Sequence, residues 1–181
     1  LAVSDFNAQI IATSTARPGS CLEIGAGRGT KTYVMACRAR RCGLHGRHVA
    51  VDLSAAKCEI NRQRLKQAGL AEGIEFASGD GCNLDAALAQ IDAVGERALF
   101  DTVFLDAPCS GTGTMRRHPE IPWRLVSNDI EDGLPKLQLQ LLREAARRVK
   151  PGGELIYATC SVLMAENEQL LDAFLQTEQG L

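Results

Sequence analysis

The sequence predicts an α/β fold in one domain of 181 residues, with a mainly parallel sheet and helices on both faces. Short apolar segments with strand character alternate along the chain with segments whose apolar residues recur at helical spacing. A glycine-rich turn connects the first such strand to the helix that follows it. Two later strands lead directly into polar runs that each contain a cysteine, and ligands bind at the carboxyl ends of strands in such sheets.

The first part of this alternation predicts three helices and three strands. A helix is expected over residues 4–16, and a second over residues 30–40. Ser54 is a suitable N-cap for a third helix that runs to residue 68. The apolar segments between these helices predict strands at residues 21–24, 48–52 and 74–77.

The second part continues the same alternation with one long interruption. Pro135 is expected in the first turn of a strong helix, in which Leu137, Leu141 and Leu142 recur on one face. An irregular stretch over residues 107–134 precedes this helix. The remaining expected elements are a helical segment at 84–94, a strand at 100–105, a turn at 151–153, a strand at 154–158 and a helix at 165–176.

The composition is typical of a soluble globular protein, with 45% hydrophobic and 23% charged residues. The apolar runs are far too short to span a bilayer, and no signal peptide opens the sequence. The seven cysteines are odd in number and form no C-x-x-C pair, which argues against a disulfide framework or a standard zinc site. We therefore expect a cytoplasmic protein without a bound metal.

The net charge of −2 argues against a strong, free-standing nucleic-acid binder. Two basic clusters are nevertheless present, one between Arg38 and His48 and one formed by Arg116, Arg117 and His118. A solvated surface explains most clusters of this kind. The second cluster is more suggestive, because it follows one of the two cysteine-containing runs.

The glycine-rich turn at residues 23–29 (Glu-Ile-Gly-Ala-Gly-Arg-Gly) favours an adenosyl cofactor. Its glycines allow close approach of the backbone to a ligand, and amides at a helix start favour polar groups. Asp52 ends the second strand, where a carboxylate can bind ribose hydroxyls, and Asp80 follows the third strand. A nicotinamide cofactor is the alternative, although the spacing differs from that of dinucleotide binders.

Two cysteine-containing runs, taken together, carry a resemblance to a known family. Residues 106–113 (Asp-Ala-Pro-Cys-Ser-Gly-Thr-Gly), followed by residues 116–121, are similar to the fourth motif of the Sun/Fmu family of RNA cytosine-5 methyltransferases. Residues 158–161 (Ala-Thr-Cys-Ser), with Glu166 and Asn167 shortly after, resemble the sixth motif. The likeness covers nearly the whole chain and is closest to the bacterial ribosomal RNA members.

The resemblance implies a Rossmann-like, S-adenosylmethionine-dependent methyltransferase fold, with residues 1–181 as one catalytic domain. The N-terminal RNA-binding region and the C-terminal hairpin of the family are not expected within these residues. The first motif departs from the family pattern, with Glu23 in place of aspartate and Arg28 in place of proline. The cofactor-binding residues implied are Glu23, Ala26, Gly27, Arg28, Gly29, Thr30, Lys31, Thr32, Asp52, Asp80 and Asp106.

The resemblance also assigns roles in covalent catalysis. Cys160 is expected to attack carbon 6 of cytosine, and Cys109 to remove the proton from carbon 5 and release the product. Asp106 is expected to hydrogen-bond the base. The activity implied is formation of 5-methylcytosine during ribosomal RNA processing, with RNA as the partner. An idle RNA-binding module, or a methyltransferase acting on tRNA or another substrate, remains the alternative.

Overall fold

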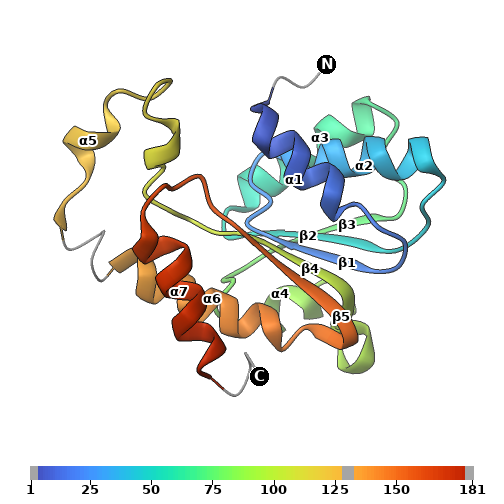
Figure 1. Ribbon diagram of the computed structural model, residues 1–181. Helices are drawn as coiled ribbons and strands as arrows, with labels where there is room; N and C mark the ends of the chain where they lie inside the picture. The colour runs from blue at the N-terminus through green and yellow to red at the C-terminus, as the bar shows by residue number, and fades with distance from the viewer. Residues whose placement is uncertain (1–3, 128–132, 178–181) are drawn as a thin grey trace.

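The strands of the computed structural model, which describes residues 4–127 and 133–177, are β1 (Cys21–Ile24), β2 (His48–Asp52), β3 (Ile74–Ser78), β4 (Phe100–Asp106) and β5 (Val149–Ala158). They form one parallel sheet in the order β3-β2-β1-β4-β5 (Figure 1). The chain first adds strands on one side of β1 and then crosses to the other side. The carboxyl ends of β1 and β4 therefore meet at the point where the strand order reverses, which is where ligands bind in such sheets.

The helices of the described residues are α1 (Phe6–Thr15), α2 (Thr30–Cys42), α3 (Ala55–Gln67), α4 (Asp85–Ala89), α5 (Ile121–Arg124), α6 (Leu134–Ala146) and α7 (Glu168–Leu175). Helices α1, α2 and α3 cover one face of the sheet, and α4, α6 and α7 cover the other (Figure 1). The segment that carries α5 projects beyond the sheet. Short 3₁₀ turns occur at Gly95–Ala98, Thr112–Thr114 and Met164–Glu166.

Alternation of side chains along the strands builds two hydrophobic layers. Leu22 of β1 and Val103 of β4 are fully buried against the layer of α4, α6 and α7. Phe104, the next residue of β4, is fully buried against Ala12 of α1 and Met35 of α2. Burial of each large apolar side chain stabilises the fold by roughly 1.5–3 kcal/mol. The predicted parallel sheet with helices on both faces is confirmed.

Two predicted elements differ from the structure. The helix expected over 84–94 is only one and a half turns long, and its continuation is prevented by Asp92, whose φ is +53°. The last strand starts at Val149 rather than at residue 154. The expected turn is present as an irregularity inside β5, where residues 150–153 lie opposite the single residue Asp101. Lys150 closes this bulge by donating to the Asp101 carboxylate at 3.0 Å.

The remaining expectations agree with the structure, except that the last expected helix is interrupted. Ser54 caps α3, since its hydroxyl accepts a hydrogen bond from the Lys57 amide. The helix expected from Pro135 begins one residue earlier as α6. The last expected helix is divided into the 3₁₀ turn at Met164–Glu166 and α7. Part of the expected irregular stretch, residues 128–132, lies outside the described residues.

Candidate active site

The two cysteines singled out by their motifs are in direct contact. Cys109 follows β4 and Cys160 follows β5, and these strands are paired in parallel up to Asp106 and Ala158. Their Sγ atoms lie 3.2 Å apart, and the Cys160 amide donates to Cys109 Sγ at 3.3 Å. Cys109 is half-buried and Cys160 is exposed. The sheet thus presents two adjacent thiols at its carboxyl edge, one of them accessible.

The contact shifts the pKa values of the two thiols in opposite directions. The hydrogen bond from Cys109 lowers the pKa of Cys160 to about 7, and Lys31 adds to this effect while burial and Asp106 oppose it. The same hydrogen bond, together with burial, raises the pKa of Cys109 far above the ordinary thiol value. One sulfur is therefore available as a thiolate near neutral pH while the other keeps its proton.

Other cysteines of the chain show the opposite behaviour. Burial raises the pKa of Cys21, of Cys58 and of Cys82. Cys58 is almost inaccessible and donates its thiol hydrogen to the Ala77 carbonyl at 3.3 Å. Such thiols are unreactive and act as small apolar side chains. The structure therefore distinguishes packing cysteines from Cys160.

Asp106 and Lys31 form an ion pair beside the thiols. Asp106 is the last residue of β4, Lys31 lies in the first turn of α2, and Lys31 Nζ is 2.6 Å from Asp106 Oδ2. Both side chains are about three-quarters buried. Burial raises the pKa of Asp106, although the ammonium group of Lys31 partly offsets this. Lys31 is thus paired at the site rather than solvated at a helix start.

The loop between β1 and α2 turns sharply around glycine. Gly25 has φ of +81°, and a Cβ atom there would lie 2.3 Å from the Asp106 carbonyl oxygen, so only glycine fits. Gly27 also has positive φ, but the space above it is open. Its amide donates to Asp52 Oδ2 at 2.9 Å, and Asp52 Oδ1 accepts from the Ser54 amide at 2.9 Å. One carboxylate therefore holds two loops around an open glycine surface.

Several predicted cofactor residues form contacts within the fold. Glu23 is fully buried, with Oε2 3.0 Å from His48 Nε2 and Oε1 without a hydrogen-bond partner. The hydroxyls of Thr30 and Thr32 accept hydrogen bonds from Arg64 and Asn61 of α3. These three side chains are therefore directed into the fold, and their contacts with a cofactor stay predictions.

The other predicted cofactor residues lie along the same edge of the sheet. Asp80 is exposed, and its Oδ1 accepts from the Cys82 amide at 2.9 Å. Arg28 is exposed at the tip of the loop, whereas Ala26 and Gly29 are buried. The open surface at Gly27 and the carboxylates of Asp52 and Asp80 together fit an adenosyl group with ribose hydroxyls.

A polar network that was not predicted from the sequence lies next to the two thiols. The hydroxyls of Ser110, Thr112 and Ser161 contact one another at 3.0–3.2 Å. Glu166 and Gln138, both with no exposed surface, complete the network. The position of Glu166 shortly after the second cysteine was one available signal. The other was the polar Gln138 on the same helical face as Leu141 and Leu142.

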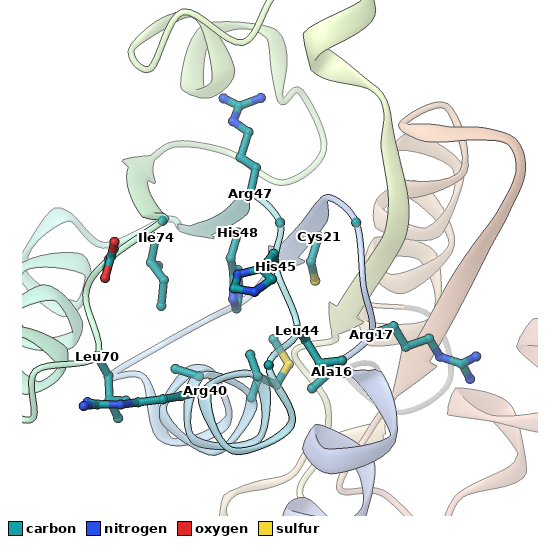
Figure 2. A pocket seen from close by; sticks show the side chains of 18 of the residues that line it. Ala16, Arg17, Cys21, Arg40, Leu44, His45, Arg47, His48, Leu70 and Ile74 are labelled. Atoms are coloured by element: carbon teal, nitrogen blue, oxygen red, sulfur yellow. The ribbon is translucent and has the colours of Figure 1, made fainter.

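Cavities lie at both edges of the sheet. One, of about 500 Å³, lies beside Cys109 and is lined by Cys109, Arg124, Leu125 and Leu137 among others. The other, of about 550 Å³, lies at the opposite edge, where β1, β2 and β3 begin. Figure 2 shows His45 and His48 pointing into it, while the Arg47 guanidinium points away. The larger cavity shares no lining residue with the thiol site.

A family model matches most of this chain. The model describes 16S rRNA methyltransferase RsmB/F and matches residues 13–181. The chain belongs to this family. Its five-stranded parallel sheet is the Rossmann-like methyltransferase sheet, and both cysteine motifs lie within the matched residues.

Curated relatives have the same family name. Ribosomal RNA small subunit methyltransferase B of Shewanella oneidensis is 43% identical over 127 residues, covering 70% of this chain and 27% of that protein. Its counterpart in Salmonella typhi is 41% identical over 128 residues, covering 71% of this chain and 28% of that protein. The chain therefore spans a little over a quarter of the length of these relatives.

Solved structures show the same fold. The crystal structure of PH0851 matches with a TM-score of 0.82 and 30% identity, covering 96% of this chain and 37% of that chain. TrmN from Thermus thermophilus matches with a TM-score of 0.60 and 22% identity, covering 92% of this chain and 40% of that chain, which supports the fold alone.

Over residues 4–127 and 133–177, no helix has the length and apolar character to cross a membrane, and no cluster of metal-ligating side chains is found.

Proposed function

We propose that this chain transfers a methyl group to carbon 5 of a cytosine in ribosomal RNA. The family and the fold imply S-adenosylmethionine as the cofactor. The observation that carries the proposal is the contact between Cys109 and Cys160, in which one thiol stabilises the other as a thiolate. An idle RNA-binding module would need neither thiol.

The reaction needs a nucleophile, because carbon 5 of cytosine does not take a methyl group unaided. The Cys160 thiolate adds to carbon 6, which places electron density on carbon 5. S-adenosylmethionine, when bound, supplies the electrophilic methyl group that carbon 5 takes up. Once the Cys160 sulfur is bonded to carbon 6, the hydrogen bond that most strongly raises the pKa of Cys109 is lost, and Cys109 gives its proton to water. The Cys109 thiolate then takes the proton from carbon 5. The electron pair of that C–H bond restores the double bond between carbons 5 and 6, and the bond from carbon 6 to sulfur breaks to release the Cys160 thiolate.

The charged pair beside the thiols has two tasks in this proposal. Asp106 hydrogen-bonds the base near ring nitrogen 3, where charge develops when the thiolate adds. Lys31 orients the Asp106 carboxylate through their 2.6 Å contact. Gly27, Asp52 and Asp80 would hold the cofactor, Asp52 by accepting hydrogen bonds from ribose hydroxyls and Asp80 by accepting from the adenine amino group.

The cavity beside Cys109 is suited to a base that has left its stack. Its volume of about 500 Å³ lies within the usual range for small ligands. Apolar walls from Ile121, Leu125 and Leu137 offer contact to a base face, and Arg124 offers charge to a phosphate. A buried target atom in a duplex is out of reach of both thiols, so an unpaired or flipped cytosine is the expected substrate.

RNA as the partner and the cytoplasm as the location belong to the same proposal. The exposed Arg116, Arg117 and His118 lie on the segment between Cys109 and α5 and favour contact with phosphates. The names of the curated relatives favour ribosomal RNA over tRNA. The odd number of unpaired cysteines favours a reducing compartment.

Transfer of a labelled methyl group tests the proposal. The purified protein is expected to label ribosomal RNA from S-adenosylmethionine, and digestion of the RNA to nucleosides should yield 5-methylcytosine. Cys160→Ala should abolish the label, whereas Cys42→Ala, a change at another exposed thiol, should not. Label recovered in DNA, in protein or in another nucleoside would contradict the proposal.

A further inference from the structure

Glu166 is a buried carboxylate that contacts the neighbours of both thiols. It has no exposed surface. Its Oε1 accepts from the Ser110 amide at 2.9 Å, and its Oε2 accepts from the hydroxyls of Ser110 and Ser161. Ser110 directly follows Cys109, and Ser161 directly follows Cys160. One carboxylate therefore bridges the two loops that carry the thiols.

Helix α6 is also bonded to Glu166. Gln138 of α6 donates to Glu166 Oε1 at 2.8 Å and to the carbonyl of Pro108 at 2.8 Å. Pro108 directly precedes Cys109, so the residues on both sides of this thiol are fixed. The polypeptide on either side of Cys109 has little freedom to move while Glu166 and Gln138 are in place.

The carboxylate is ionised despite its burial. Burial alone would raise the pKa of Glu166, but hydrogen bonds from Ser110, Ser161 and Gln138 outweigh it and lower the pKa. A buried charge is costly unless several donors satisfy it, as they do here. Such a group is difficult to explain as packing, since an apolar side chain of similar size would avoid this cost.

The charge also sets the direction of the hydrogen bonds around it. A carboxylate accepts and cannot donate, so both serine hydroxyls must direct their hydrogen atoms at Glu166. The Ser161 oxygen is then free to accept from the Leu163 amide at 3.1 Å. Thr112 accepts from the Val162 amide at 3.0 Å and directs its one hydroxyl hydrogen at the oxygen of Ser110 or of Ser161. A neutral side chain would leave these directions undefined.

We propose that Glu166 is a positioning residue that holds Cys109 and Cys160 in contact and so makes Cys160 reactive. It acts through Ser110 and Ser161, to which its oxygens are bonded. The hydrogen bond between the two sulfur atoms is lost when a relative shift of the loops carries them from 3.2 Å to beyond hydrogen-bonding distance. The importance of this reactivity for methyl transfer rests on the proposed function, but the thiol contact itself does not.

Alkylation of Cys160 by iodoacetamide, measured against pH without RNA or cofactor, tests the inference. The charged and titratable groups facing Cys160 are Cys109, Asp106 and Lys31, and none of them is altered in the variants. The rate of alkylation of the wild-type protein should rise with pH, with a midpoint near pH 7. Mass spectrometry of the peptide that contains Cys160 measures this rate. Glu166→Ala should raise this midpoint by about one unit, toward the ordinary thiol value of roughly 8.5.

Glu166→Gln keeps the side-chain volume and guards against misfolding of the alanine variant. Its amide oxygen can still accept from the Ser110 amide and Gln138, but its NH₂ group cannot accept from the two hydroxyls. A smaller upward shift is therefore expected. Glu168→Ala, a change of an exposed glutamate nearby, should leave the midpoint unchanged.

The inference is overturned if either Glu166 variant folds, as shown by circular dichroism, and alkylates Cys160 with the wild-type midpoint. It is supported if the midpoint rises in the folded variants, whether or not the wild-type protein methylates RNA. A protein that shows the predicted shift but no methylation would contradict the proposed function and leave the positioning role intact.

Discussion

Cys109 Sγ lies 3.2 Å from Cys160 Sγ, although 51 positions separate the two residues in the sequence. Parallel pairing of β4 and β5 brings the loops together, and the Gly113 amide fixes them by donating to the Cys160 carbonyl at 2.9 Å. A Cβ atom at Gly113 would lie 2.8 Å from that carbonyl, so the close approach requires glycine. The reactivity of Cys160 is thus a property of the folded sheet.

Activity is expected to rise with pH through about 7. The contact with Cys109 lowers the pKa of Cys160 to about 7, so the nucleophilic thiolate forms as the pH rises through this value. A plot of kcat/KM against pH should show a rising limb with this midpoint. A midpoint near the ordinary thiol value of roughly 8.5 would contradict the assignment. The profile of Cys42→Ala should match that of the wild type.

Lys31→Met is expected to reduce methylation roughly 10-fold or more. The substitution removes a hydrogen bond between charged groups, which is worth roughly 1.5–3 kcal/mol, and frees Asp106 from its orientation. It should also raise the pKa of Asp106 further, since Lys31 lowers that pKa. Single-turnover methylation measures the loss. Lys66→Met, at an exposed lysine of α3, is the control, and an equal loss in both variants would refute a specific role for Lys31.

Asp52→Ala is expected to weaken cofactor binding. The carboxylate fixes the loop through Gly27 and, in the proposal, accepts hydrogen bonds from ribose hydroxyls. Loss of one such bond, worth roughly 1.5–3 kcal/mol, weakens affinity roughly 10-fold or more. Isothermal titration calorimetry with S-adenosylmethionine measures the change, with the exposed Asp172→Ala as the control. Unchanged affinity in Asp52→Ala would remove the ribose assignment.

Binding of RNA to this chain is expected to be weak and strongly dependent on salt. The net charge is −2, so affinity depends on local clusters such as Arg116 and its neighbours. Arg116→Ala should lower the slope of log affinity against log salt by about 1. Arg62→Ala, at an arginine that pairs with Glu59 on α3, is the control and should leave the slope unchanged. Tight binding that is insensitive to salt would be inconsistent with phosphate contacts.

Much of the site could be predicted because the relevant residues follow strands. Parallel strands place their carboxyl ends at one edge, so Asp52, Asp106 and the two cysteines were expected together. Glycines at the first turn indicated the cofactor loop, and positive φ at Gly25 and Gly27 gives the physical reason.

The supporting residues could not be predicted in the same way. Gln138 lies on the same face of α6 as Leu141 and Leu142, so helical spacing accounts for its burial, but the partners of its polar side chain depend on how α6 packs against the loop after β4. Glu23 was predicted to bind the cofactor, which stays a prediction, but its contact with His48 of the neighbouring strand could not be foreseen. Both interactions are contacts between segments distant in sequence, which local patterns do not encode.

The division of labour between the thiols is the central claim, and trapping of a protein–RNA adduct tests it most directly. Cys160→Ala should form no covalent complex and no methylated RNA, because the attacking thiolate is absent. Cys109→Ala should still attack and methylate but fail to release the product, and should accumulate as a complex that resists denaturant on a gel. An adduct trapped in Cys160→Ala and absent in Cys109→Ala would contradict the account, because it would exchange the two roles.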